Sequence, residues 1–225
     1  MRRIGPVFLL FLFLALPAAA ETVFIEAGRD NTLIEDPAGA FSNGAGPGFF
    51  VGRNNQPEGL SIRRGVIFFE LAGVIPGNAV IQSVSLRLYQ DANNADQRLV
   101  SLHRLLDDWG EGTSFSTGGA GAAATAGDAT WLYSFYPQIF WSHEGGNFTG
   151  QSSGRQFVGG PGSYSWEGTD ALIKDIVFWL RKPNKNFGWI LVGDEDAPQT
   201  VKRFSSRENL IPEFRPRLEV TYMLP

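Results

Sequence analysis

Short segments in which apolar and polar residues alternate constrain the fold of this chain most strongly. Residues 81–89 alternate cleanly, with Leu86 and Leu88 on one face and polar side chains on the other. Residues 98–105 and 217–222 repeat the pattern. A period of two indicates a half-buried β-strand, because successive side chains of a strand point to opposite faces. These segments are therefore expected to pair in antiparallel sheets.

Further strands are expected where short apolar runs lie between turn residues. They fall at 22–26, 49–52, 64–71, 186–192 and 199–208. Two other stretches predict loops: the polar run 29–37 and the Gly/Ser-rich run 148–163. About ten short strands separated by Gly and Pro turns are typical of an all-β fold. The fold class expected is an antiparallel two-sheet sandwich that is jelly-roll-like.

One segment, residues 169–181, has helical periodicity instead. Leu172 and Ile176 belong to an apolar stripe at helical spacing, and Thr169 precedes it as an N-cap. Pro183 follows the run and stops it. We expect one short helix here, whose apolar stripe covers one end of the core.

Residues 1–20 have the three-part layout of a secretory signal peptide. Arg2 and Arg3 form a basic start, residues 7–16 an apolar centre, and residues 17–20 a small-residue end, which predicts cleavage before Glu21. The rest of the chain, residues 21–225, is expected to form a single β-sandwich domain. The mature protein is then exported to the periplasm or the extracellular space, with no membrane insertion after the signal is removed.

Charge and cysteine content exclude several classes of partner and chemistry. Without residues 1–20 the chain keeps 17 basic and 23 acidic residues, a formal charge of −6. An acidic chain with no basic run repels phosphate backbones, so nucleic acid is not an expected partner. The chain has no Cys, which excludes disulfides and Cys-based metal sites. The sequence leaves the oligomeric state open.

The stretch from residue 102 to residue 146 gathers the residues best suited to a binding site. It holds three of the six Trp, both His and several carboxylates on a Gly-rich backbone. Flat aromatic rings can stack on sugars, although a Trp in a small sandwich commonly packs in the core. Trp141 is the better candidate for exposure. The predicted ligand-binding residues are Trp109, Trp131, Trp141, Tyr133, Tyr136 and His143.

Carboxylates in the same region suggest a hard cation such as calcium, which takes six to eight oxygen ligands and accepts loop carbonyls. The predicted metal ligands are Asp107, Asp108, Glu111 and Asp128, with a second cluster at Asp30 and Asn31 that also includes Glu35 and Asp36. The alternative is structural: such carboxylates also cap turns or pair with Arg. Arg203, Arg207 and Glu208 are expected to form salt bridges that fix the last strands.

A catalytic role has little support in the sequence. Neither His lies in a G-x-S-x-G nucleophile motif, and no H-E-x-x-H is present. Glycosidic cleavage by two carboxylates needs a separation of about 5–9 Å, which a sequence does not give. No catalytic residue is therefore assigned.

Several short motifs, in order and spaced over nearly the whole chain from residue 22 to residue 222, resemble the DNRLRE-domain family. They are Asp30-Asn31-Thr32-Leu33, Ser42-Asn43-Gly44, 64–70, 75–81, Leu86-Arg87-Leu88, Trp109-Gly110-Glu111, Ala129-Thr130-Trp131, Asn186-Phe187-Gly188-Trp189, 204–208 and 215–218. The resemblance implies a β-sandwich with an extracellular role, related to carbohydrate-binding modules. Some relatives resemble alginate binders with a basic face, from which this acidic chain departs.

Three hypotheses of function follow. The first is a secreted, non-catalytic domain that binds carbohydrate or a cell-surface polymer through the loops of residues 102–146. The second is a structural or adhesive protein of the envelope or matrix that acts by protein contact. The third is a polysaccharide hydrolase or lyase that uses Asp108 or Glu111.

Overall fold

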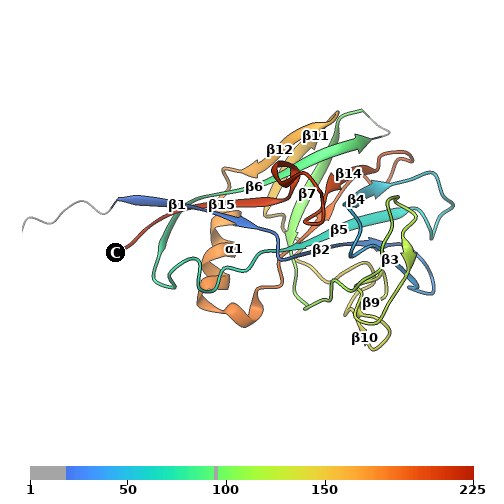
Figure 1. Ribbon diagram of the computed structural model, residues 1–225, viewed down its shortest axis with the longest axis horizontal. Coiled ribbons are helices and arrows are strands. Elements are labelled where there is room, and N and C mark those ends of the chain that lie inside the picture. The colour runs from blue at the N-terminus through green and yellow to red at the C-terminus, as the bar shows by residue number, and fades with distance from the viewer. Residues whose placement is uncertain (1–18, 94–95) are drawn as a thin grey trace, which may run out of the picture.

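The computed structural model describes residues 19–93 and 96–225. The chain is all-β, as predicted, with 41% of the described residues in strands and 9% in helices (Figure 1). The strands are β1 (Ala20–Glu26), β2 (Arg29–Ile34), β3 (Phe41–Ser42), β4 (Gly48–Arg53), β5 (Ile62–Phe68), β6 (Val80–Asn93), β7 (Arg98–Arg104), β8 (Ala122–Ala123), β9 (Tyr133–Phe135), β10 (Ile139–Phe140), β11 (Gly154–Val158), β12 (Gly162–Glu167), β13 (Trp189–Val192), β14 (Lys202–Ser205) and β15 (Arg217–Met223). The helices are α1 (Asp170–Arg181) and two 3-10 turns, η1 (Pro183–Lys185) and η2 (Pro212–Phe214).

Eleven of these strands form one curled antiparallel sheet. Its order is β1-β15-β6-β14-β4-β5-β13-β7-β11, with β12 added to β6 and β2 added to β5. We call β1, β15, β6, β12 and β14 the β6 half of the sheet, and β2, β5, β13, β7 and β11 the β13 half.

The two halves meet at β4, where the sheet bends. Residues 48–51 of β4 pair with β14, whereas Gly52 and Arg53 pair with β5. Gly52 adopts a φ of +114° at the bend, and a Cβ there would lie 3.0 Å from the carbonyl oxygen of Thr200. Only glycine adopts this backbone conformation readily, so Gly52 allows one strand to serve both halves.

The main core lies between the two halves. Leu86 and Leu88 of β6 and Leu102 and Leu191 of the β13 half are fully buried in the same hydrophobic cluster. The indole N–H of Trp166 on β12 donates to the carbonyl of Val100 on β7 at 3.0 Å, which joins the halves directly. The alternation in the sequence therefore points these side chains into one shared interior.

Helix α1 confirms the prediction for residues 169–181. The Thr169 hydroxyl accepts a hydrogen bond from the backbone N–H of Leu172 at 3.2 Å, as an N-cap does. Leu172, Ile176 and Trp179 are buried in the main core. We call the curled sheet, α1 and their core the body of the protein.

Residues 106–147 leave the body as a separate excursion, which we call the lobe. Leu105 and Phe148 form an isolated β-bridge at its base, and the N–H of Leu106 donates to the carbonyl of Asn147 at 2.9 Å. The lobe covers the outer face of the β13 half, where a second hydrophobic cluster includes Leu33, Val66 and Ile190. In Figure 1 it carries the short strands β9 and β10 away from the sheet.

Two loop predictions are wrong. Residues 29–34 form β2 although they are polar, because Asn31 and Thr32 are buried and hydrogen-bonded. Residues 148–163 were expected to be mostly loop, but β11 and the start of β12 lie there. In β12 the small residues Ser163 and Ser165 alternate with inward Tyr164 and Trp166, a strand pattern that the Gly/Ser content conceals.

The sequence also predicted a signal peptide at residues 1–20 and no membrane insertion once it is removed. Residues 1–18 of the predicted signal peptide lie outside the described part of the chain, and Ala20 already belongs to β1. Among the described residues, no helix is long and apolar enough to cross a membrane.

Candidate functional site

The three tryptophans predicted as ligand-binding residues are buried in the lobe. Trp109 is fully buried, and Trp131 and Trp141 are 9% and 5% exposed. The indole N–H of Trp141 donates to the Thr130 carbonyl at 2.9 Å, and that of Trp109 donates to the Phe187 carbonyl at 2.8 Å. The expectation that Trp141 is exposed is therefore wrong, because its ring fills the core beneath the lobe.

Aromatic side chains reach the surface instead on the hairpin formed by β9 and β10, where Tyr133 and Tyr136 are half-buried and Phe140 is exposed. Tyr133 stacks on Phe140 with ring centroids 4.2 Å apart, and Tyr136 meets Tyr133 edge-on at 5.3 Å. Phe140 is 61% exposed and Ile139 is 53% exposed. We call Tyr133, Tyr136 and Phe140 the aromatic platform. Of its members, the sequence predicted the two tyrosines.

Hydrogen bonds to the rest of the lobe hold the platform in place. The Thr130 hydroxyl accepts from the backbone N–H of Tyr133 at 3.0 Å. The N–H of Tyr136 donates to the Asp128 carbonyl at 2.8 Å, and the N–H of Gly110 donates to the Ser134 carbonyl at 3.0 Å. Because residues 133, 134 and 136 are tied at these points, the rest of the lobe supports the β9 side of the hairpin.

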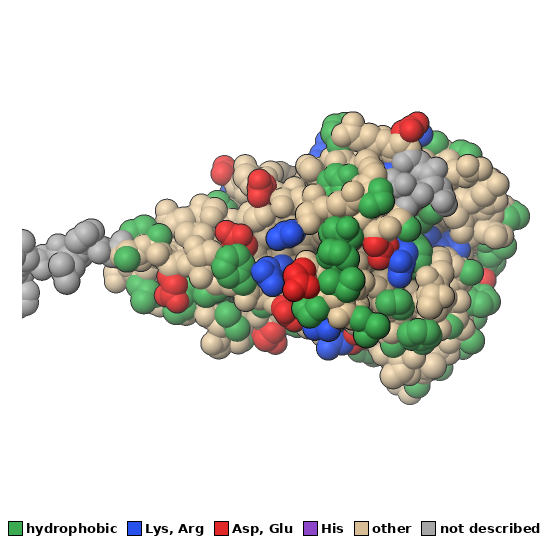
Figure 2. Space-filling view, turned by 45° about the horizontal axis from the view of Figure 1, so that its top comes forward, with side chains coloured by type: hydrophobic (Ala, Val, Ile, Leu, Met, Phe, Trp, Pro, Cys, Tyr) green, Lys and Arg blue, Asp and Glu red, His purple; other side chains and the backbone are tan. Residues whose placement is uncertain are grey.

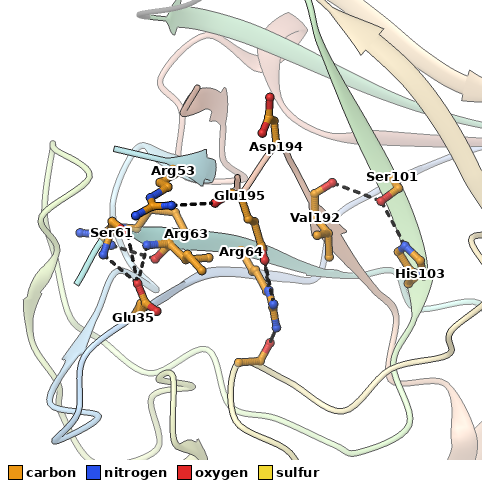
Figure 3. A network of polar contacts seen from close by, with 12 residues as sticks. Glu35, Arg53, Ser61, Arg63, Arg64, Ser101, His103, Val192, Asp194 and Glu195 are labelled. Atoms are coloured by element: carbon orange, nitrogen blue, oxygen red, sulfur yellow. Dashed lines mark hydrogen bonds and ion pairs between the residues drawn. The ribbon is translucent and has the colours of Figure 1, made fainter. Parts of the chain in front are cut away.

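Arg64 of β5 fastens the lobe to the body. Its guanidinium forms a bidentate pair with Glu195 at 2.8 and 2.9 Å and donates to the Gly145 carbonyl at 2.9 Å (Figure 3). The same guanidinium lies 4.9 Å from the Trp131 ring centroid. Planar guanidinium groups suit both kinds of contact, so one side chain joins a sheet, a loop and an aromatic core.

A groove of about 270 Å³ lies where the hairpin leaves the body. Trp131, Leu132 and Glu144 of the lobe line it, facing Glu35 and Asp36, which follow β2. Glu35 accepts hydrogen bonds from the backbone N–H groups of Ser61 and Ile62 (Figure 3). The partly exposed edge of Trp131 is the one tryptophan surface of the lobe that reaches this groove.

The carboxylates of the first predicted metal site serve separate structural contacts. Asp107 accepts from the N–H of Ser142 at 3.1 Å, and Asp108 pairs with Arg29 at 3.3 Å. Asp128 is buried and accepts from the N–H groups of Thr125 and Ser114. A Cβ at Gly112 would lie 1.6 Å from the Asp128 carboxylate, so this close contact requires glycine.

Asp30 and Glu111, predicted in two different metal clusters, meet where β2 touches the lobe. The N–H of Asp30 donates to Glu111 at 2.9 Å, and Arg207 forms ion pairs with Glu111 at 3.0 Å and Glu208 at 2.8 Å. The Asp30 carboxylate accepts from the N–H of Arg207 at 2.7 Å. The predicted salt bridges of Arg207 are confirmed. We call Asp30, Glu111, Arg207 and Glu208 the joint between the body and the lobe, and the Arg207 guanidinium supplies its positive charge.

Burial raises the pKa of the acids that meet here. Burial, with the neighbouring charge of Glu208, raises the pKa of Asp30 well above its ordinary value. Burial also raises the pKa of both Glu111 and Glu208. One guanidinium therefore faces three acids that are difficult to ionise together.

The second predicted metal cluster is also structural in its contacts. The Asn31 side-chain oxygen accepts from the N–H groups of Thr32 and Asn43 and from the Ser42 hydroxyl. Across residues 19–93 and 96–225, no group of three or more Asp, Glu, His or Cys side chains is placed to hold a metal ion. Calcium binding stays a prediction of the sequence without a converging ligand set.

The remaining predicted residue, His143, is exposed on the loop that follows Trp141. Its Nδ1 lies 3.3 Å from the side-chain oxygen of Asn147. Sequence reasoning missed Phe140 as a platform residue, because its alternation with Trp141 did not show which of the two faces the solvent. Only the pairing of Phe140 with Tyr133 across the hairpin decides this.

Comparison of the chain with protein-family models finds no match, and comparison with curated proteins finds none. The fold and the site together define a β-rich domain that carries an aromatic platform at the surface of a loop-built lobe.

Proposed function

We propose that this protein is an exported, non-catalytic domain that binds carbohydrate or a cell-surface polymer through the aromatic platform. The observation that carries the proposal is the cluster of Tyr133, Tyr136 and Phe140, which lies at the surface on a hairpin tied to a buried core. Aromatic rings with one open face suit the C–H faces of sugar rings, and tyrosine hydroxyls add hydrogen bonds.

The proposal includes the finer fold assignment. The curled sheet, with two halves that enclose one core, supports a jelly-roll-like sandwich. In this class of fold, loops at one edge carry binding residues while the sheets supply a rigid scaffold. The signal-like residues 1–20 support export to the periplasm or the extracellular space.

The test removes the platform one ring at a time. Purified protein is titrated with a panel of polysaccharides by affinity electrophoresis, and the best ligand is measured by calorimetry. Phe140→Ala and Tyr133→Ala are each expected to weaken binding about two- to ten-fold, the range for losing one aromatic contact. A thermal melt of each variant establishes that the fold is retained.

A matched control lies on β11, the strand that ends the order of the curled sheet. Phe157 of β11 is 57% exposed, close to the 61% of Phe140, and it lies outside the lobe. Phe157→Ala is expected to leave binding unchanged. Equal losses in Phe157→Ala and Phe140→Ala, or no binding to any glycan tested, would overturn the proposal.

One observation favours the alternative, a structural or adhesive protein. Leu210 is 93% exposed and Ile211 is 47% exposed in the loop before η2. On the face seen in Figure 2, groups of hydrophobic side chains reach the surface among charged ones. Exposed apolar patches commonly mark protein contacts. Concentration-dependent self-association that Leu210→Ser abolishes would support this second function.

The hydrolase or lyase hypothesis has the weakest support. Asp108 pairs with Arg29, and Glu111 is engaged by Arg207 and by the N–H of Asp30. Both acids are therefore committed to contacts that hold the lobe. Release of reducing ends that stops in Glu111→Gln, with the melting temperature unchanged, would restore the hypothesis.

A further inference from the structure

A polar cleft lies on the body, between the first turns of α1 and the loop that precedes β11. Its volume is about 450 Å³, within the usual range of small-ligand sites. Its lining consists of Arg104, Thr149, Gln151, Ser152, Ser153, Asp170, Ala171, Lys174 and Asp175. Almost every residue of the lining offers a hydrogen-bonding side chain, whereas most small-ligand sites are largely apolar.

The floor of the cleft is organised around Arg104. Its guanidinium lies 3.2 Å from Asp175 and 4.2 Å from the Phe178 ring centroid, so an ion pair and a stacking contact fix its plane. Asp175 is buried and is itself held by the Ser153 hydroxyl at 2.5 Å and the Trp189 indole N–H at 2.8 Å. A second layer of hydrogen bonds therefore orients the group that faces the cleft, as in preorganised binding sites.

The rim of the cleft carries polar groups that the protein does not use internally. Within the described part of the chain, the side chains of Gln151, Asp170 and Lys174 form no hydrogen bond or ion pair. All three residues are exposed. The rim thus offers one ammonium, one carboxylate and one amide to a bound molecule, which together supply both donors and acceptors.

The charge of the lining restricts the ligand. Two cationic side chains, Arg104 and Lys174, face two carboxylates, Asp170 and Asp175. Asp175 already balances Arg104, so a simple anion gains little there, and the two cations likewise disfavour a positively charged ligand. A neutral molecule with many hydroxyl groups satisfies such a lining best, because each hydroxyl both donates and accepts.

We infer that this cleft is a second ligand site, which binds a neutral mono- or disaccharide unit. It is distinct from the aromatic platform: α1 and the β9–β10 hairpin lie on different parts of the molecule (Figure 1). The site goes beyond the proposed function, since it recognises hydroxyl groups within a pocket and not the apolar face of a sugar ring. Binding at the two sites is therefore separable by mutation.

The test is an NMR titration of the purified protein with glucose, galactose, mannose, N-acetylglucosamine and their disaccharides. Glucuronate and glucosamine serve as charged counterparts. At least one neutral sugar is expected to shift amide signals of residues 149–153 and 170–175 saturably, with a Kd of about 1 mM or tighter. Glucuronate and glucosamine are expected to bind more weakly than that sugar.

Two variants locate the site. Gln151→Ala combined with Lys174→Ala is expected to weaken binding about ten-fold, and both side chains are exposed and form no hydrogen bond or ion pair among the described residues, so the fold is retained. Lys185→Ala, at an exposed lysine beyond the other end of α1, is the matched control and should leave the Kd unchanged. Phe140→Ala should also leave it unchanged, which separates this site from the platform.

Three results would overturn the inference. They are no saturable shift with any neutral sugar up to about 50 times the expected Kd, an unchanged Kd in the Gln151→Ala, Lys174→Ala variant, and tighter binding of glucuronate or glucosamine than of every neutral sugar. Loss of polymer binding in Phe140→Ala, with the cleft titration intact, would leave both proposals standing.

Discussion

The body and the lobe bury three tryptophans each, but they hold them by different means. Trp166, Trp179 and Trp189 of the body lie on β12, α1 and β13, which are regular elements with continuous backbone pairing. The lobe buries its own three, whereas its strands β8, β9 and β10 have only two or three residues each. The lobe core is therefore built on irregular backbone.

In the body, backbone N–H groups pair with neighbouring strands, whereas in the lobe many of them pair with polar side chains. Asp107, Asp128 and Thr130 each accept a hydrogen bond from a backbone N–H group of the lobe. Buried N–H groups must be paired somewhere, and a loop pairs them with polar side chains. The position of the platform therefore depends on a few polar residues, whereas the sheet depends on many equivalent backbone hydrogen bonds.

The largest expected effect comes from removing one tryptophan from each core. Trp189→Ala is expected to lower the global free energy of unfolding by about 3–5 kcal/mol, the usual cost of a large aromatic cavity. Trp141→Ala should cost a similar amount, but only for opening of the lobe. Urea titration combined with hydrogen exchange distinguishes the two, because the strands of the body keep their protection in Trp141→Ala. If Trp141→Ala exposes both regions equally, the body and the lobe unfold as one unit.

A smaller effect is expected at the joint between the two regions. Asp30→Asn keeps an acceptor for the Arg207 N–H but removes a buried charge. The variant should be more stable than the wild type by about 1–3 kcal/mol at pH 8, the cost of a poorly compensated buried group. Urea unfolding from pH 4 to pH 8 measures it, with Asp196→Asn in an exposed turn as the control.

The direction of the pH dependence follows from the raised pKa values of Asp30, Glu111 and Glu208. A pKa raised by folding contributes stability in full below the ordinary value, 3.8 for Asp30 and 4.5 for the glutamates. That stability is lost as the pH rises through the folded-state pKa. The wild type is thus expected to lose stability on this account as the pH rises from about 4, and Asp30→Asn should show a shallower slope. An equal slope of unfolding free energy against pH in both proteins would mean that groups other than Asp30 cause the loss of stability.

The smallest expected effect compares two threonines with the same local role. The hydroxyls of Thr169 in the body and Thr130 in the lobe each accept a hydrogen bond from the backbone N–H three residues later, at 3.2 and 3.0 Å. Alanine at either position should cost about 0.5–2 kcal/mol, and serine should restore most of it. Thr169→Ala should lower the global melting temperature, while Thr130→Ala should mainly speed exchange of the β9 amides. A global loss in Thr130→Ala would show that the lobe supports the body.

Local sequence patterns predicted the body well. Alternation placed β6, β7 and β15, and the apolar stripe with its threonine cap placed α1, since both periodicities are written in neighbouring residues. They failed at β2, where the buried side chains have partners distant in sequence: the Glu111 carbonyl of the lobe for Asn31 and the Phe50 N–H of β4 for Thr32. They also failed at β12, where outward-facing serines alternate with inward-facing aromatic residues and the Gly/Ser content indicated a loop.

By itself, the sequence determined the strand-rich class, the helix and the stretch in which a site is best sought. Only the tertiary structure decided which aromatic rings are exposed: Trp141 and Phe140 are neighbours in the chain, yet one fills a core and the other reaches the solvent. It also decided that Asp30 and Glu111, 81 residues apart, share an arginine, and that Arg104 and Asp175 form a cleft. Periodicity reports the two faces of a segment, whereas long-range packing decides which face is covered.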